Sequence, residues 1–188
     1  MTQVFDTGTP ASGADLRHAL GALLATGTAY LAGLPDSVFF APQGSAWPPA
    51  DHVRHLHRSA TPVALALTLP RWLLAIRFGR GAGQSRSFAE MREVYRAALA
   101  RGAKAGRFAP APEGVPADPA ARRNEIMNDW ARATVGLQNA VARWPEKALD
   151  RQPLPHPVLG PLTVREMLAF TVYHTAHHLG RVAERAGD

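Results

Sequence analysis

Proline and glycine divide this chain into helical segments, and this division constrains the fold more than any other feature. The chain has 16 prolines and 16 glycines in 188 residues. They gather between segments in which apolar residues recur every three or four positions, the spacing of one face of an α-helix. No segment shows the apolar–polar alternation of a half-buried strand. The sequence therefore predicts an all-α protein.

Four long helices are expected, and each has a recognisable start. Ser12 with Asp15, and Thr163 with Glu166, have the spacing of capping boxes, in which two side chains satisfy backbone N–H groups at a helix start. A proline in the first turn marks the other two starts. The helices are expected over about residues 12–33, 48–70, 118–144 and 163–186.

Helices of this length and number pack as an up-and-down four-helix bundle. Residues 1–188 are expected to form a single domain, of a size that allows a substantial core. Residues 79–116 are polar and rich in glycine, and they are expected to form an insertion between the second and third helices. This insertion contains one short helix, at 88–99. We expect this insertion to lie over the end of the bundle.

The last helix carries histidines on its apolar face. At 100° per residue, His174 and His178 lie one turn apart on the same face as Met167 and Thr171. Imidazoles in an apolar stripe are costly unless they are hydrogen-bonded or bound to a metal. A hydrogen-bonded core histidine is the simpler interpretation of either residue alone, but the i, i+4 pair favours a shared metal ion. His177 lies beside this face and is interpreted as a neighbour of the site.

A third ligand has to come from elsewhere in the chain. His52, His55 and His57 all lie on the second helix, and helical periodicity does not decide which of them faces the bundle axis. His18 stands alone on the first helix and His156 lies in a proline-rich loop, so both are expected at the surface. The sequence thus leaves three candidates for the third ligand.

The chain has no cysteine. This excludes disulfides, a thiolate nucleophile and every cysteine-based zinc site, so histidines and carboxylates have to hold any metal. The His174/His178 spacing matches that of the zinc metalloproteases, but Thr175 follows His174 where their H-E-x-x-H motif has its glutamate. Neither a G-x-S-x-G motif nor a phosphate-binding glycine loop is present.

The charge pattern and the termini limit the partners. The formal net charge is +6, but the arginines are scattered and no aromatic–basic array accompanies them, so nucleic-acid binding is not expected. The most apolar segment, residues 61–76, is interrupted by Pro70 and Arg71 and is too short to span a membrane. The first residues do not resemble a signal peptide. A cytoplasmic protein without membrane partners is expected.

Two segments resemble the DinB/YfiT superfamily. Residues 47–56, WPPADHVRHL, are similar to its Trp-led start of helix two, which ends in His-Leu. Residues 160–168, GPLTVREML, followed by YHTAHH at 173–178, resemble its last helix with an H-x3-H pair and a doubled histidine. The resemblance covers nearly the whole chain. It implies a four-helix bundle with a divalent-metal site whose ligands are His55, His174 and His178.

The resemblance also implies a class of chemistry. Three imidazoles leave a metal with an open position for water or substrate; zinc and nickel suit such a site best, and iron or manganese can also occupy it. The superfamily includes metal-dependent hydrolases and enzymes that use low-molecular-weight thiols, such as bacillithiol S-transferases and the mycothiol-dependent maleylpyruvate isomerase. A small electrophile with a thiol cosubstrate is therefore expected, with mycothiol a candidate if the composition reflects a GC-rich bacterial genome. The alternative is a non-catalytic bundle with a structural metal or histidine site and a role in dimerisation as a homodimer.

The sequence assigns no catalytic residue. Glu125 and Asp129 share one face of the third helix, but solvated or ion-paired carboxylates are the simpler interpretation. Tyr173 points away from the histidine face and is expected to pack. The arginines nearest the insertion could bind a substrate carboxylate, although surface positions are expected for them; they are Arg77, Arg80 and Arg86.

Overall fold

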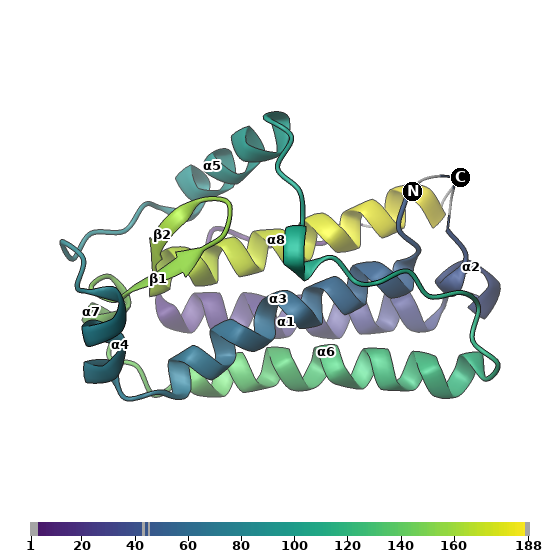
Figure 1. Cartoon of the computed structure of the whole chain (residues 1–188), viewed down its shortest axis with the longest axis horizontal. Coiled ribbons are helices and arrows are strands. Elements are labelled where there is room, and N and C mark those ends of the chain that lie inside the picture. Colours follow the sequence, from purple (N-terminus) through teal and green to yellow (C-terminus); the bar gives the residue numbers. More distant parts are fainter. Residues whose placement is uncertain (1–3, 43, 45, 187–188) are drawn as a thin grey trace.

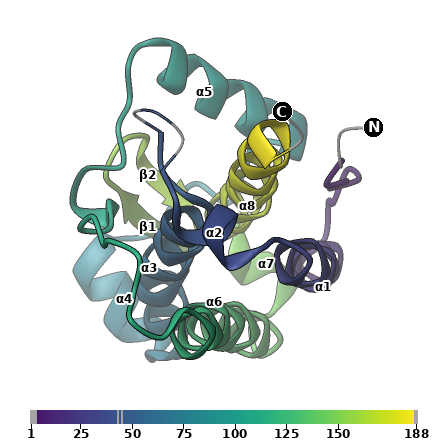
Figure 2. The ribbon, with the colours of Figure 1, turned by 90° about the vertical axis from the view of Figure 1, so that its right-hand side faces the viewer.

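Four long helices form the body of the protein (Figure 1). The structure is a computed structural model that describes residues 4–42, 44 and 46–186. Its long helices are α1 (Gly13–Ala32), α3 (Pro49–Thr68), α6 (Pro119–Val141) and α8 (Val164–Ala186). The pairs α1–α6, α6–α3, α3–α8 and α8–α1 are in contact, so the helices close a ring that Figure 2 shows end-on. The predicted four-helix bundle is confirmed.

The helices begin where their caps predict. Ser12 Oγ accepts a hydrogen bond from the Asp15 backbone N–H at 3.1 Å, and the Asp15 carboxylate accepts one from the Ser12 N–H at 2.9 Å. Thr163 and Glu166 exchange the same pair of bonds at 3.2 and 2.9 Å. Both capping boxes satisfy backbone donors that a helix start otherwise leaves without a partner.

The core lies where the four apolar stripes meet. Trp130 of α6 is 1% exposed and is the largest fully buried side chain of the described residues. It packs beside Gly27 of α1 and Leu179 of α8: a Cβ added at Gly27 would lie 2.9 Å from the indole and 2.8 Å from the Leu179 side chain. Glycine at position 27 therefore lets three helices approach one another closely.

The second helix breaks at Pro70, as expected. α3 ends at Thr68, and α4 (Arg71–Phe78) follows at an angle of 113°. Proline disrupts a helix because it lacks the N–H donor and restricts the residue before it. Among the described residues, no single helix is long and apolar enough to cross a membrane; α3 and α4 meet that test only when taken together across their bend.

The segment 79–116 lies along a flank of the bundle, so the expected position over its end is wrong. Its helix α5 (Phe88–Ala100) packs against α8, as Figures 1 and 2 show, and a short 3₁₀ helix, η1 (Gly106–Phe108), contacts α3. The buried Tyr95 of α5 meets Phe170 of α8 edge-on, with ring centroids 5.0 Å apart. This apolar face of α5 explains the position, because burial against α8 removes it from water.

Two short strands and two short helices complete the described structure. β1 (Pro153–His156) and β2 (Gly160–Thr163) form a short antiparallel hairpin that the sequence did not predict, in a structure that is otherwise helical as expected. Three of the eight strand residues are prolines, which are uncommon inside strands, so neither segment has the sequence pattern of a strand. Gly160 has a φ of 76°, a left-handed conformation that glycine adopts readily in a turn. The short helices are α2 (Asp36–Phe40) and α7 (Glu146–Leu149).

Candidate metal centre

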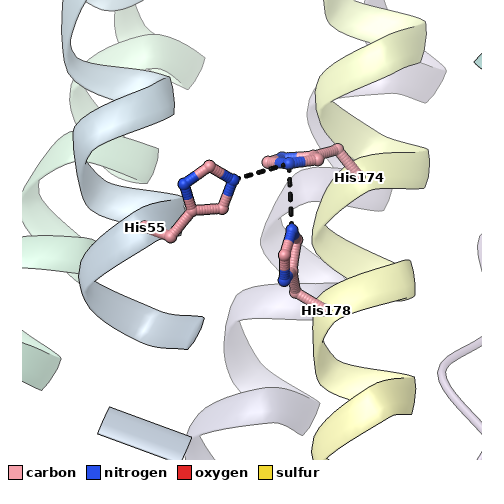
Figure 3. A group of neighbouring side chains, drawn as sticks. All are labelled: His55, His174 and His178. Atoms are coloured by element: carbon pink, nitrogen blue, oxygen red, sulfur yellow. Dashed lines mark hydrogen bonds between the residues drawn. The ribbon is translucent and has the colours of Figure 1, made fainter. Parts of the chain in front are cut away.

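Helices α3 and α8 bring His55, His174 and His178 together between them (Figure 3). The Nε2 atoms of His55 and His178 lie 3.0 and 3.1 Å from the Nε2 atom of His174. One ligand nitrogen of each ring lies within 4.8 Å of those of the other two, and all three side chains are buried. The structure thus joins two residues that are adjacent on one helix with a third from a distant part of the chain.

The last helix places its pair as its periodicity predicts. His174 and His178 are one turn apart and face the core. Four apolar or hydroxyl residues on the same face of α8 are also buried: Val164, Met167, Thr171 and Val182. The α8 face that carries the histidines is therefore the face that packs into the bundle.

Hydrogen bonds orient two of the three rings. His55 Nδ1 lies 3.0 Å from the carbonyl oxygen of Phe108, and because a carbonyl can only accept, this nitrogen donates. A neutral His55 then has only a lone pair on Nε2. His178 Nδ1 lies 2.7 Å from Nδ1 of His52. If His178 donates in that bond, its Nε2 also presents a lone pair to the centre of the cluster.

His52, one of the three candidates for the third ligand, is a buried neighbour of the cluster and not a member of the three-histidine group. It precedes His55 by three residues, so it shares that helix face, and this i, i+3 relation was the available signal. Its Nε2 atom is buried and has no hydrogen-bond partner among the described residues. Burial lowers the pKa of His52 to about 3, with the charges of Arg185 and of nearby histidines acting in the same direction. His52 is therefore neutral, and its contact within the cluster is the hydrogen bond between its Nδ1 atom and that of His178.

Aromatic rings enclose the cluster. The ring of Trp47, just before α3, lies parallel to that of His178 at 6.2 Å and 5.2 Å from that of His55. Phe170 of α8 stacks on His174 with the centroids 4.9 Å apart. These rings restrict the orientation of the imidazoles and reduce the access of water to them.

The three imidazoles suit a divalent metal by their chemistry. Burial is the main cause that holds the pKa of His174 and His178 well below the usual value, and burial also lowers the pKa of His55. Neutral imidazole is the form that binds metals. Lone pairs facing one another at about 3 Å repel unless a cation or a proton lies between them. Tetrahedral zinc with Zn–N bonds of 2.0–2.1 Å needs about 3.3 Å between nitrogens, slightly more than the 3.0 and 3.1 Å that separate His174 Nε2 from the other two Nε2 atoms.

A cavity of about 770 Å³ opens beside the cluster. All three histidines line it, together with residues of α3, α5, α8, the hairpin and the segment around η1. None of the described residues that line it is aspartate or glutamate, and no carboxylate of the described residues joins the three-histidine group. A metal on these nitrogens would therefore have a coordination position toward the cavity.

The sequence model of the DinB superfamily matches residues 19–182. The chain belongs to the DinB superfamily. Among solved structures it is similar to TT2238, described as a four-helix bundle protein, with a TM-score of 0.53 and 20% sequence identity over 89% of this chain and 95% of that one. This similarity concerns the fold alone. No curated protein matches the sequence.

The other candidate residues of this DinB protein lie away from the cluster or beside it. Glu125 and Asp129 pair with Arg122 and Arg132 on α6 and do not line the cavity. Of the three arginines near the insertion none lines the cavity, and Arg86 donates from Nε to Glu166 at 2.8 Å. Tyr173 is partly buried and packs on the core, and His18 is exposed. His57 is hydrogen-bonded to the Asp129 carbonyl oxygen through Nδ1, and His177 lines the cavity.

His156 was expected at the surface, and the structure shows that this is wrong. It ends β1, is half-buried, and lines the cavity with its ring 4.4 Å from that of Phe170. Burial lowers the pKa of His156 to about 4. Its Nδ1 also accepts hydrogen bonds from the N–H groups of Val158 and Leu159, at 3.2 and 3.0 Å, so this nitrogen has no place for a proton. The hairpin, which the sequence did not predict, explains the difference.

This depressed pKa predicts that acid destabilises the metal-free DinB protein. Between pH 6.5 and 4 the unfolded chain binds a proton at His156 that the folded chain excludes, so the free energy of unfolding falls as the pH falls. The slope is at most about 1.4 kcal/mol per pH unit, reduced by the partial exposure of the ring. His156→Asn keeps an acceptor and cannot become charged. Urea denaturation at pH 7 and pH 5 should show a smaller loss for this variant than for the wild type, and equal losses would contradict the prediction.

Proposed function

We propose that this protein is a divalent-metal-dependent enzyme that transfers a low-molecular-weight thiol to a small electrophile. The observation that carries the proposal is the set of three buried Nε2 atoms beside a cavity. His55, His174 and His178 would hold the ion, with zinc or nickel the best match to three nitrogen ligands. The bound ion would supply a nucleophile at neutral pH by lowering the pKa of a coordinated thiol or water.

The residues of the cavity favour thiol transfer over hydrolysis. A hydrolase commonly uses a carboxylate or a histidine as general base. None of the described residues that line this cavity is a carboxylate, so His156 and His177 are the lining residues outside the proposed ligand set that could take that role. A thiol cosubstrate brings its own nucleophile, so the protein does not have to provide a general base that activates water. The chain would then position the two reactants: His52 and the Phe108 carbonyl orient two of the ligands, and Trp47 shields the cluster from water.

The cavity also weighs against a purely structural site. A structural zinc site is usually closed by four protein ligands. Here the three-histidine group has no fourth histidine or carboxylate among the described residues, and the histidines border the cavity. A non-catalytic bundle remains the outcome to be distinguished from an enzyme by turnover.

The test uses untagged protein, loaded with zinc or nickel, and a chlorodinitrobenzene as electrophile. With mycothiol, bacillithiol or glutathione, attack by the thiolate would form a C–S bond while chloride leaves with the bonding electrons. We expect thioether formation that depends on the metal and is lost in the chelator-treated protein and in His174→Ala. Release of the corresponding phenol without thiol would identify a hydrolase. Metal binding with neither product from a panel of electrophiles would favour the structural alternative.

The bond from His52 predicts a measurable effect on the metal. Loss of an outer partner of a metal-bound histidine typically weakens metal affinity by about 10- to 100-fold, and His52→Leu removes the partner of His178 Nδ1. Competition with a chelator dye should show this loss, and the absorption spectrum of the cobalt-loaded protein should change because His178 is less well oriented. His52→Gln, whose amide can still accept from Nδ1, should recover part of the affinity. Leucine at the exposed His18 serves as control, and equal affinities of the two leucine variants would refute the role.

A further inference from the structure

The cavity beside the three histidines is elongated along the bundle. On α3 its lining extends from His55 to Ala66, which are eleven residues apart and therefore about 16 Å apart along the helix axis. On α8 it extends from His178 back to Met167, a similar length. With a volume of about 770 Å³ it has the size of a binding site for an organic molecule much larger than a water or a simple anion.

The walls away from the histidines are apolar. Val63 and Ala66 of α3 face this space together with Phe78, which ends α4. Leu99 of α5 and Phe170 of α8 contribute further apolar surface. The cavity therefore has one end with convergent nitrogen atoms and a long apolar remainder.

The charges of the lining select against cations. None of the described lining residues is acidic, and the cationic ones are Lys104 and Arg107, both exposed at the segment around η1. A bound metal ion would add positive charge at the histidine end. An ammonium or guanidinium group would find no counter-charge in this cavity, and burying it unpaired would be costly.

From this arrangement we infer that the substrate is an elongated amphipathic molecule, with an apolar alkyl or aryl body and an electron-rich, uncharged or anionic head. The body lies along the apolar wall from Val63 to Ala66, and the head lies at the three histidines. The part of the inference that concerns the head rests on the proposed metal function. The part that concerns the body rests on the shape and chemistry of the cavity alone.

Alkyl hydroxamates test both parts, because their head chelates zinc and their tail can be lengthened. We would titrate the acetyl, butyryl, hexanoyl and octanoyl compounds into zinc-loaded protein and into chelator-treated protein by calorimetry. Each buried methylene should lower the Kd about threefold to fourfold until the cavity is filled. Decylammonium, which carries a similar tail and a cationic head, should not bind detectably.

A pair of tryptophan variants locates the tail. Ala66→Trp fills the apolar end far from the histidines, so it should weaken octanoyl hydroxamate at least tenfold and leave the acetyl compound unchanged. Ala97→Trp adds the same side chain at an exposed position of α5 outside the cavity and should change neither. Circular dichroism of both variants checks that they are folded.

The outcomes separate the inference from the proposed function. A Kd that is independent of tail length, or an octanoyl affinity that Ala66→Trp leaves unchanged, overturns the apolar-body inference even if zinc binds. Tail-length dependence that is equal in zinc-loaded and chelator-treated protein supports the apolar body and rejects the metal as the site of the head. Tight binding of decylammonium overturns the charge argument.

Discussion

Replacing His174 with alanine is expected to abolish stoichiometric metal binding. His174 is the central member of the group, since its Nε2 atom lies within 3.1 Å of the Nε2 atoms of both other histidines. Its removal leaves two nitrogens on different helices, whereas a tightly held divalent ion in a three-histidine site needs all three. The loss should exceed the roughly 100-fold that removal of an outer partner typically causes. Elemental analysis of untagged protein and competition with a chelator dye measure it.

Thermal unfolding gives a second measurement of the same prediction. A ligand that binds only the folded state stabilises it, by about 4 kcal/mol when its concentration is 1,000 times the Kd. Zinc or nickel should therefore raise the melting temperature of the wild type and have little effect on His174→Ala. Alanine at the exposed His18 is the matched control and should behave like the wild type. A metal content and a metal-induced shift that are the same in His174→Ala and wild type would refute the site.

The sequence predicts the bundle well because local signals act where the helices begin and end. Capping boxes, first-turn prolines and the break at Pro70 depend on neighbours a few residues away, and all of them have the expected effect in the structure. The hairpin and the position of α5 were not predicted correctly. The position of α5 depends on contacts with α8 across a long sequence separation, and no local pattern contains that information. The hairpin is local, but its two four-residue strands contain three prolines and show no strand pattern.

For the histidine cluster, too, local signals predict one part correctly and the rest depends on contacts between helices. The facing of His174 and His178 follows from periodicity within one helix, and the structure confirms that both are buried on one face. The choice among His52, His55 and His57 depends on how α3 is rotated against α8, which a single helix cannot specify. The resemblance to the DinB superfamily pointed to His55, and the structure brings that residue to the pair, while the role of all three as metal ligands stays a prediction. The partner relation between His52 and His178 became visible only when both helices were placed.

Trp130→Ala is expected to destabilise the protein by about 3–5 kcal/mol, the usual cost of removing a large buried aromatic side chain. The indole is 1% exposed and fills the space beside Gly27, where α1, α6 and α8 lie close together. Loss of that side chain leaves a cavity that these backbones can close only in part, because Leu179 already lies against Gly27. A domain of this kind is typically stable by about 5–15 kcal/mol, so the variant loses a large fraction of its stability.

Trp72 provides the matched control for this prediction, because the same substitution there removes a side chain that is 63% exposed on α4. Most of the Trp72 surface is in water in both the folded and the unfolded chain, so little transfer free energy is lost, and the expected change is within about 0.5 kcal/mol. Urea denaturation of the metal-free proteins at pH 7 measures both variants against the wild type. Equal destabilisation by the two substitutions would mean that the contact among Gly27, Trp130 and Leu179 does not hold the three helices together. A large loss for Trp130→Ala alone would show that a strong packing contact of the bundle includes Leu179, the residue after His178, on the helix that carries two of the proposed ligands.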